Sequence, residues 1–111
     1  MMHYHATPED HTVLEKKGFL LVDSGATYMD GTTDITRTYP LGPLTEDEKR
    51  FYTWTLQSHI DLAKAVWLDY CECKMIDTIA REPLWRHLIN YRCGTGHSVS
   101  FVGNVHEGPM P

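Results

Sequence analysis

Cysteine is scarce in this chain, and its spacing argues against a disulfide-stabilised protein. The 111 residues include three cysteines. An odd number, with Cys71 and Cys73 in a C-x-C pair, is a poor disulfide framework. We therefore expect reduced thiols and a cytoplasmic protein. A zinc site formed by Cys71, Cys73, His87 and Cys93 is a minor alternative, because C-x-C lacks the usual zinc-ligand spacing.

Long apolar runs and an excess of positive charge are also missing. No apolar stretch approaches the roughly 18–20 residues that a membrane span needs. The start of the chain is polar and shows no apolar region of a signal peptide. The formal net charge is −5, whereas nucleic-acid-binding proteins usually present a basic face. We therefore expect neither a membrane nor a nucleic acid as partner.

What the chain does contain predicts a β-hairpin near its beginning. An apolar run over 19–22 is typical of a buried strand, and the threonine-rich run over 32–39 predicts a second strand. Asp30-Gly31 between them is a strong turn signal. A further extended segment is expected over 98–106, after the glycines of the C-terminal third.

Two helices should lie between the hairpin and this last segment. Thr45 and Glu48 have the spacing of a capping box, which predicts a helix over about 46–68. A second helix is expected over about 74–90, kinked or split at Pro83. The apolar stripes expected on the two helices are Tyr52, Leu56, Ile60, Ala63 and Trp67 on the first, and Met75, Ile76, Ile79, Ala80, Leu84, Leu88 and Ile89 on the second.

Two aspartates on the hairpin, Asp23 and Asp34, are the first candidate metal ligands. With a turn centred on Asp30-Gly31, both side chains point to the same face of the hairpin. They are then offset by four residues, or on the order of 13 Å at ~3.3 Å per residue. A wider turn or a bulge would have to shift the register before the two carboxylates could share a metal centre.

An imidazole from a separate part of the chain is the third candidate ligand. A Gly-Thr-Gly stretch leads to His97, and His106 follows nine residues later. Carboxylate and imidazole ligands together suit Mn²⁺, Co²⁺, Fe²⁺ or Zn²⁺, and two such ions about 3.5–4 Å apart can hold a bridging hydroxide. Spacing alone leaves open that the aspartates only end strands and that His97 is structural.

Several segments in register resemble the Xaa-Pro aminopeptidases (aminopeptidase P). The resemblance lies in four motifs and a His3-Tyr4 pair: LVDSGATY at 21–28, GTTDITRT at 31–38, GTGH at 94–97 and NVHEGP at 104–109. It covers nearly the whole chain, in order and spacing. It implies an α+β pita-bread fold, present here in part as a β-hairpin, two helices and a further strand.

The resemblance also implies a function and a role for each candidate residue. The family releases the N-terminal residue from peptides whose second residue is proline, through a hydroxide bound to two divalent ions, usually Mn²⁺. By position, Asp23, Asp34 and His97 would be metal ligands, with Asp34 bridging both ions. His106 would lie beside the scissile bond and steady the developing charge, and His3 would assist substrate binding or proton transfer.

The same resemblance implies that residues 1–111 are a single domain that is a fragment of a larger catalytic domain. Two further glutamate ligands of the family would lie beyond Pro109, so activity of the isolated chain is in doubt. Apolar side chains such as Leu56, Trp67 and Trp85 should be exposed, which favours a homo-oligomer or a complementary fragment as partner. A non-catalytic metal-binding or interaction module of the same ancestry is the alternative function, and a remnant that binds no metal is a third.

Overall fold

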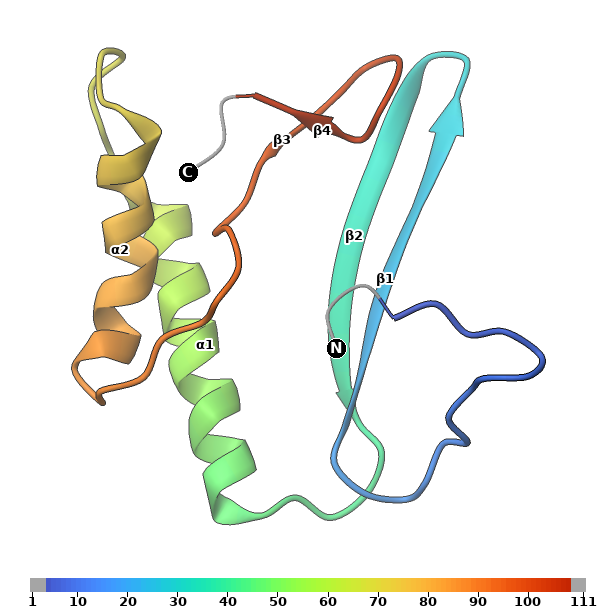
Figure 1. Ribbon diagram of the computed structural model, residues 1–111. Helices are drawn as coiled ribbons and strands as arrows, with labels where there is room; N and C mark the ends of the chain where they lie inside the picture. The colour runs from blue at the N-terminus through green and yellow to red at the C-terminus, as the bar shows by residue number, and fades with distance from the viewer. Residues whose placement is uncertain (1–3, 109–111) are drawn as a thin grey trace.

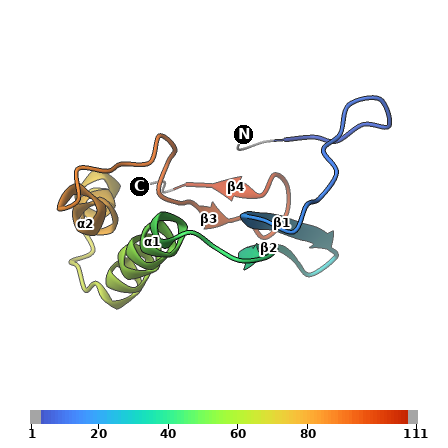
Figure 2. The same ribbon diagram turned by 90° about the horizontal axis from the view of Figure 1, so that it is seen from below.

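The computed structural model describes residues 4–108 and has an α+β architecture. Its elements are β1 (Phe19–Tyr28), β2 (Gly31–Pro40), α1 (Glu46–Lys64), α2 (Cys73–Trp85), β3 (Ser98–Val99) and β4 (His106–Glu107). Strands β1 and β2 form one antiparallel pair, and β3 and β4 form another. In Figure 1 the β1–β2 hairpin lies on one side, α1 and α2 lie together on the other, and the segment after α2 crosses between them. Viewed from below, these elements form a thin layer (Figure 2) with extents of 46 × 42 × 19 Å.

The hairpin forms as predicted, but its register differs from the predicted one by two residues. Tyr28 pairs with Gly31, so that the two-residue turn is Met29-Asp30 rather than Asp30-Gly31. The predicted register would have placed Pro40 opposite Leu21, inside the ladder, where proline has no N–H group to donate. In the structure Pro40 pairs with Phe19 at the end of the ladder, which avoids this loss.

Helix α1 begins as predicted and ends earlier. The Glu48 amide donates to the Thr45 hydroxyl (3.2 Å), and the Thr45 amide donates to the Glu48 carboxylate (2.8 Å), which completes the capping box. The helix ends at Lys64 rather than near residue 68, because Ala65 is extended with φ −63° and ψ 140°. The predicted N-terminus was correct because a capping box is a local signal, whereas the C-terminus carried none.

Helix α2 also ends earlier than predicted, at Trp85 instead of near residue 90. Pro83 lies within its last turn, and Leu88 adopts a left-handed conformation with φ 58°. The Ile89 amide then donates back to the Leu84 carbonyl (3.2 Å), as happens where a left-handed residue reverses the chain after a helix. The continuous apolar pattern up to Ile89 therefore reflects a folded-back segment and not a longer helix.

The small apolar core lies on α2, where Ile76, Ala80 and Leu84 are buried. These three residues were predicted to be buried, but Met75 and Leu88 were predicted wrongly, since they are 63% and 97% exposed. The predicted stripe on α1 is exposed along its length, from Tyr52 and Leu56 to Trp67. The amphipathic pattern was correct, but within residues 4–108 the contacts to that face, such as Phe19 on Tyr52, leave it largely exposed.

The expected exposure of Leu56, Trp67 and Trp85 is confirmed. The two halves of the molecule meet where Phe19 of β1 stacks on Tyr52 of α1, with ring centroids 5.5 Å apart. No helix in the described part of the chain is long and apolar enough to cross a membrane.

Candidate metal centre

A carboxylate of the hairpin and an imidazole of the segment that crosses from α2 to β3 (residues 86–97, the crossing segment) face each other in the structure. Asp34 lies on β2, and His97 immediately precedes β3. The Nε2 atom of His97 is 3.4 Å from the Oδ2 atom of Asp34. Both side chains are about three-quarters buried, with exposed fractions of 23% and 24%. Two residues 63 positions apart in the sequence thus converge on one partly enclosed spot.

The second ring nitrogen of His97 determines how this pair can react. Nδ1 of His97 lies 2.9 Å from the backbone carbonyl oxygen of Ser98. A carbonyl oxygen only accepts hydrogen bonds, so Nδ1 carries the proton and donates it. With the proton on Nδ1 alone, the imidazole would direct the lone pair of Nε2 at the Asp34 carboxylate. Two acceptors that face each other favour a cation between them, and a histidine held through its other nitrogen is typical of a metal ligand.

Asp23 lies on the same face of the hairpin as Asp34. Asp23 pairs with Thr36, and Asp34 pairs with Gly25, so the two aspartates are offset by two residues instead of the predicted four. Such diagonal neighbours are about 7–8 Å apart. The corrected register therefore brings the carboxylates closer without a bulge. Oδ1 of Asp23 accepts a hydrogen bond from the Thr36 hydroxyl (2.8 Å), which orients the carboxylate.

Both aspartates line a shallow pocket of about 400 Å³ on this face. Gly25, between them, has no room for a side chain, because a Cβ atom there would lie 2.4 Å from the Thr33 carbonyl oxygen. Val105, which precedes β4, also lines the pocket. The pocket therefore joins the hairpin to the C-terminal segment that carries His106.

His106 lies beside the Asp34–His97 pair. Because His106 pairs with Val99 across β3 and β4, its ring comes close to His97. The two ring centroids are 4.1 Å apart, with an angle of 59° between the ring planes. His106 is exposed. His3, the other predicted catalytic residue, lies outside the described residues.

These contacts bring together some of the predicted ligands and not all of them. Within residues 4–108, no group of three or more His, Cys, Asp or Glu side chains is close enough together to hold an ion. The structure brings Asp34 and His97 together, places His106 beside them, and puts Asp23 on the adjoining part of the same face.

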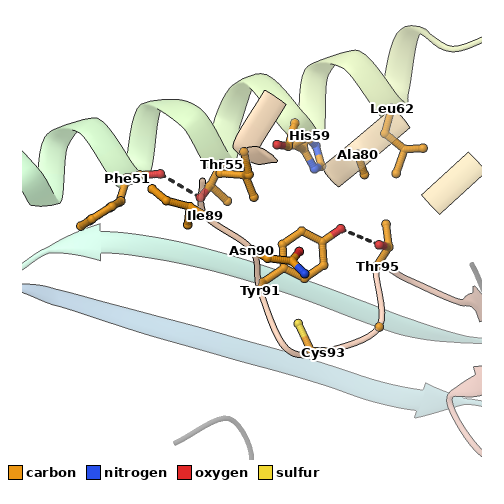
Figure 3. A pocket seen from close by; sticks show the side chains of 13 residues that line it. Phe51, Thr55, His59, Leu62, Ala80, Ile89, Asn90, Tyr91, Cys93 and Thr95 are labelled. Carbon is orange, nitrogen blue, oxygen red and sulfur yellow. Dashed lines mark hydrogen bonds between the residues drawn. The ribbon is translucent and has the colours of Figure 1, made fainter. Parts of the chain in front are cut away.

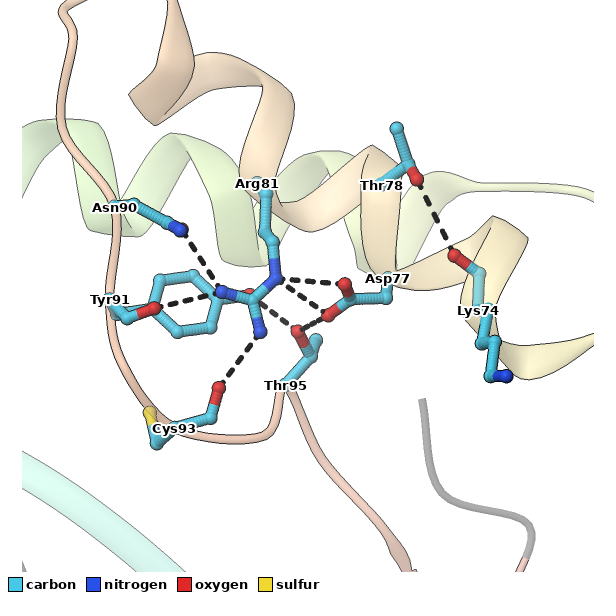
Figure 4. Close-up of polar contacts among 8 residues, drawn as sticks. All are labelled: Lys74, Asp77, Thr78, Arg81, Asn90, Tyr91, Cys93 and Thr95. Atoms are coloured by element: carbon cyan, nitrogen blue, oxygen red, sulfur yellow. Dashed lines mark hydrogen bonds and ion pairs between the residues drawn. The ribbon is translucent and has the colours of Figure 1, made fainter.

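A network around Arg81 was not identified from the sequence. Arg81 on α2 forms an ion pair with Asp77 (2.8 Å) and donates to backbone carbonyls of the segment that leads to His97, as Figure 4 shows. The hydrogen bond from Arg81 holds the pKa of the Asp77 carboxyl below its ordinary value, against the effect of burial. The four-residue spacing of Asp77 and Arg81 on a predicted helix was a signal available in the sequence.

A second pocket, of about 430 Å³, lies between α1, α2 and residues 89–95. Figure 3 shows Thr55 and His59 of α1 on one side, and Tyr91 directed at the hydroxyl of Thr95 on the other. Leu62, Ala80 and Ile89 give it a largely apolar lining. It contains none of Asp23, Asp34 and His97.

Comparison with known proteins identifies the family of the chain that carries this carboxylate and imidazole pair. The model of "Metallopeptidase family M24" matches residues 1–111. The chain belongs to metallopeptidase family M24.

Relatives agree with this assignment along almost the whole chain. It is 44% identical over 109 residues to a probable Xaa-Pro aminopeptidase P of Laccaria bicolor, and 44% identical over 109 residues to aminopeptidase P1 of Lotus japonicus. Each alignment covers 98% of this chain and 17% of the relative. The chain therefore spans about a sixth of the length of these relatives.

A solved structure confirms the predicted partial pita-bread fold. The X-prolyl aminopeptidase of Caenorhabditis elegans, described as a cytosolic enzyme with a di-nuclear active site, matches with a TM-score of 0.78. The match has 41% sequence identity and covers 83% of this chain and 15% of the other. The resemblance to the Xaa-Pro aminopeptidases, drawn from the sequence motifs alone, is thereby confirmed.

Proposed function

We propose that this chain contributes part of the metal centre of an Xaa-Pro aminopeptidase, with Asp23, Asp34 and His97 as ligands and Asp34 bridging two ions. The observation that carries the proposal is the 3.4 Å approach of His97 Nε2 to Asp34 Oδ2, with the proton of His97 on Nδ1. Asp23 supports it by its place on the same face of the hairpin. The C. elegans structure, described as having a di-nuclear site, supports two ions in place of one.

Two divalent ions fit the donor atoms that the chain presents. Carboxylate oxygens and an imidazole nitrogen suit Mn²⁺, which we take as the native metal, with Zn²⁺, Co²⁺ and Fe²⁺ as alternatives. When bound, such ions supply Lewis acidity for hydrolysis of a peptide bond. The residues of this chain would hold them, and the hydrogen bond from His97 to Ser98 would keep the imidazole in the ligating tautomer.

The proposed substrate is a peptide with proline in second position, as the names of the relatives indicate. His106 suits a place beside the scissile bond, because its exposed ring lies against that of the ligand His97. It would steady the charge that develops on the peptide carbonyl by donating a hydrogen bond. We assign His3 to substrate binding or proton transfer on resemblance alone.

We propose a second copy of this chain or a complementary fragment as a partner. Large apolar side chains, including Leu56, Trp67 and Trp85, are exposed, and such a partner would cover them. We propose a cytoplasmic location, in line with the cytosolic enzyme of C. elegans. Neither a membrane nor a nucleic acid is proposed as a partner.

Titration with Mn²⁺ tests the metal centre. Asp34→Asn should lower the Mn²⁺ affinity by more than about 100-fold, since it removes a direct ligand and even outer partners contribute about 10–100-fold. Asp30→Asn is the matched control, because Asp30 lies in the turn of the same hairpin, and it should leave the affinity unchanged. Equal affinities of the two variants would refute the assignment of Asp34.

Release of the first residue from an Xaa-Pro peptide tests the activity. The chain is assayed alone and as a chimaera, in which it replaces the matching 109 residues of the Laccaria bicolor relative. Turnover by the chimaera in Mn²⁺ supports the aminopeptidase. Metal binding that Asp34→Asn abolishes, with no turnover in either form, would favour the non-catalytic module, and the absence of both would favour the remnant.

A further inference from the structure

Arg81 has an unusual number of partners for a side chain on a small surface helix. Its Nε atom donates to both carboxylate oxygens of Asp77 (2.9 and 2.8 Å). Nη1 donates to the side chain of Asn90 (3.0 Å) and to the carbonyl of Tyr91 (2.8 Å), and Nη2 donates to the carbonyl of Cys93 (2.8 Å). The guanidinium carbon also lies 4.1 Å from the centre of the Tyr91 ring. With an exposed fraction of 14%, the Arg81 side chain is largely buried.

The segment that Arg81 holds has little else to fix it. Between the end of α2 and the beginning of β3 it has no helix or strand. Among the described residues, no backbone–backbone hydrogen bond outside helices and strands involves residues 90–97. Instead, the carbonyls of Tyr91 and Cys93 accept hydrogen bonds from the two Nη atoms of one planar guanidinium. Lysine cannot reproduce this geometry.

The same network reaches to within two residues of the metal ligand. The Thr95 hydroxyl donates to the Asp77 carboxylate and contacts the Tyr91 hydroxyl. Only Gly96 separates Thr95 from His97, whose Nε2 faces Asp34 on β2. Figure 4 shows these side chains of α2 and of the crossing segment meeting around the guanidinium. The chain of contacts thus runs from α2 to the hairpin through His97.

We propose that Arg81, Asp77 and Thr95 are positioning residues for His97: they hold the segment 90–95 on α2 so that the imidazole meets Asp34 across the molecule. This inference rests on the proposed role of His97 as a metal ligand. A ligand carried by an unstructured segment has to be ordered when it binds an ion, and that ordering lowers the affinity. A segment already held by three hydrogen bonds from Arg81, to Asn90, Tyr91 and Cys93, binds with less of that cost.

Two pairs of variants separate positioning from general stability. Arg81→Lys keeps the charge and removes the planar guanidinium, and its control is Arg86→Lys at the C-terminal cap of the same helix. Arg86 has a similar ion pair four residues back, with Glu82 (2.6 Å), and no hydrogen bond to residues 90–97. Thr95→Val removes the hydroxyl that donates a hydrogen bond to Asp77, and its control Thr95→Ser keeps that hydroxyl.

Three measurements are made on each variant. Limited proteolysis between residues 88 and 97 is followed in the 111-residue chain and needs no metal. The Mn²⁺ dissociation constant is measured in the chimaera described above, and the unfolding temperature is measured in both forms. Arg81→Lys and Thr95→Val should weaken Mn²⁺ binding by about 10-fold and speed cleavage between 88 and 97, while Arg86→Lys and Thr95→Ser leave both unchanged.

Other results would overturn the proposal. Unchanged Mn²⁺ affinity in Arg81→Lys would do so, as would cleavage between 88 and 97 in the unaltered chain at the rate of the unfolded chain. A loss of affinity matched by faster cleavage in α1 and a lower unfolding temperature would reveal a merely structural role. A chimaera that binds no Mn²⁺ before any substitution would refute the proposed metal centre itself, whatever the cleavage between 88 and 97 shows.

Discussion

The helical half and the hairpin half of this molecule hold their functional side chains by different means. On the helical side, Ile76, Ala80 and Leu84 are buried and Arg81 ties down the segment that carries His97. On the hairpin side, every residue of β1 from Leu21 onward is exposed. Strands β1 and β2 are held mainly by their own ladder of backbone hydrogen bonds. The imidazole of His97 is thus positioned by the packing and hydrogen bonds of α2, and the carboxylates of Asp23 and Asp34 by the strand register of the hairpin.

This difference teaches where the site is vulnerable. A two-stranded hairpin is at best marginally stable alone in water, and a region with few buried apolar contacts opens at lower free energy than a packed one. Asp34 should therefore be less well ordered than His97 until an ion or a partner covers the hairpin. Substitutions that affect one half and not the other can test that expectation.

The largest effect is expected from the core of the helical half. Leu84→Ala should destabilise the chain by about 2–5 kcal/mol, because it removes buried methyl groups and leaves a cavity; Leu84 is 4% exposed. Leu88→Ala, four residues on and 97% exposed, should change stability by less than about 0.5 kcal/mol. Chemical denaturation of both variants measures the difference. Similar losses would contradict a core centred on α2.

A smaller effect is expected from the hairpin. Gly25→Ala introduces a Cβ atom 2.4 Å from the Thr33 carbonyl oxygen, so the strands have to separate locally, at a cost of about 1–3 kcal/mol. Gly25 pairs with Asp34, and Mn²⁺ affinity should fall as well. Ser24→Ala, on the opposite face of β1, is the control and should leave both properties unchanged. Normal Mn²⁺ binding by Gly25→Ala would show that the site does not depend on this register.

The smallest effect is a pH dependence in the helical half. Donation from Arg81 lowers the pKa of the Asp77 carboxyl from its ordinary value of 3.8. A carboxyl whose pKa is lowered by folding stabilises the folded state above its unfolded pKa, and this contribution is lost as the pH falls through the folded pKa. The stability of the unaltered chain should therefore decrease below about pH 4.

The variant Asp77→Asn checks this dependence. Its stability should be lower than that of the unaltered chain near neutral pH, and the two should converge in acid, as followed by thermal unfolding between pH 6 and pH 2. Glu82→Gln, on the same helix, is the control for the loss of a carboxylate. Parallel curves for Asp77→Asn and the unaltered chain would show that the Asp77 carboxylate does not supply this contribution.

Features that depend on neighbours in the sequence were predicted well. The capping box of Thr45 and Glu48, the hairpin itself and the burial of Ile76, Ala80 and Leu84 all follow from short-range patterns. The predicted metal ligands Asp34 and His97 do face each other, and what identified them was the resemblance in motifs, since spacing alone left them open.

Features that depend on distant groups were predicted poorly. The Asp30-Gly31 signal gave a turn one residue too late, because the position of Pro40 at the far end of the ladder also decides the register. The apolar pattern through Ile89 hid the left-handed reversal at Leu88. The hydrogen bonds from Arg81 to residues 90–95 could not be predicted from the sequence of the helix. Two of the acceptors are backbone carbonyls, which every residue has whatever its side chain.

The sequence by itself determined the family, the elements and the types of donor atom available to a metal, because these reside in side-chain chemistry and local propensity. Only the tertiary structure decided that Asp23 and Asp34 are two residues apart across the hairpin, and that the imidazole of His97 directs Nε2 at Asp34. Those distances arise from backbone pairing and from the hold of α2 on the crossing segment, which connect residues that are far apart along the chain.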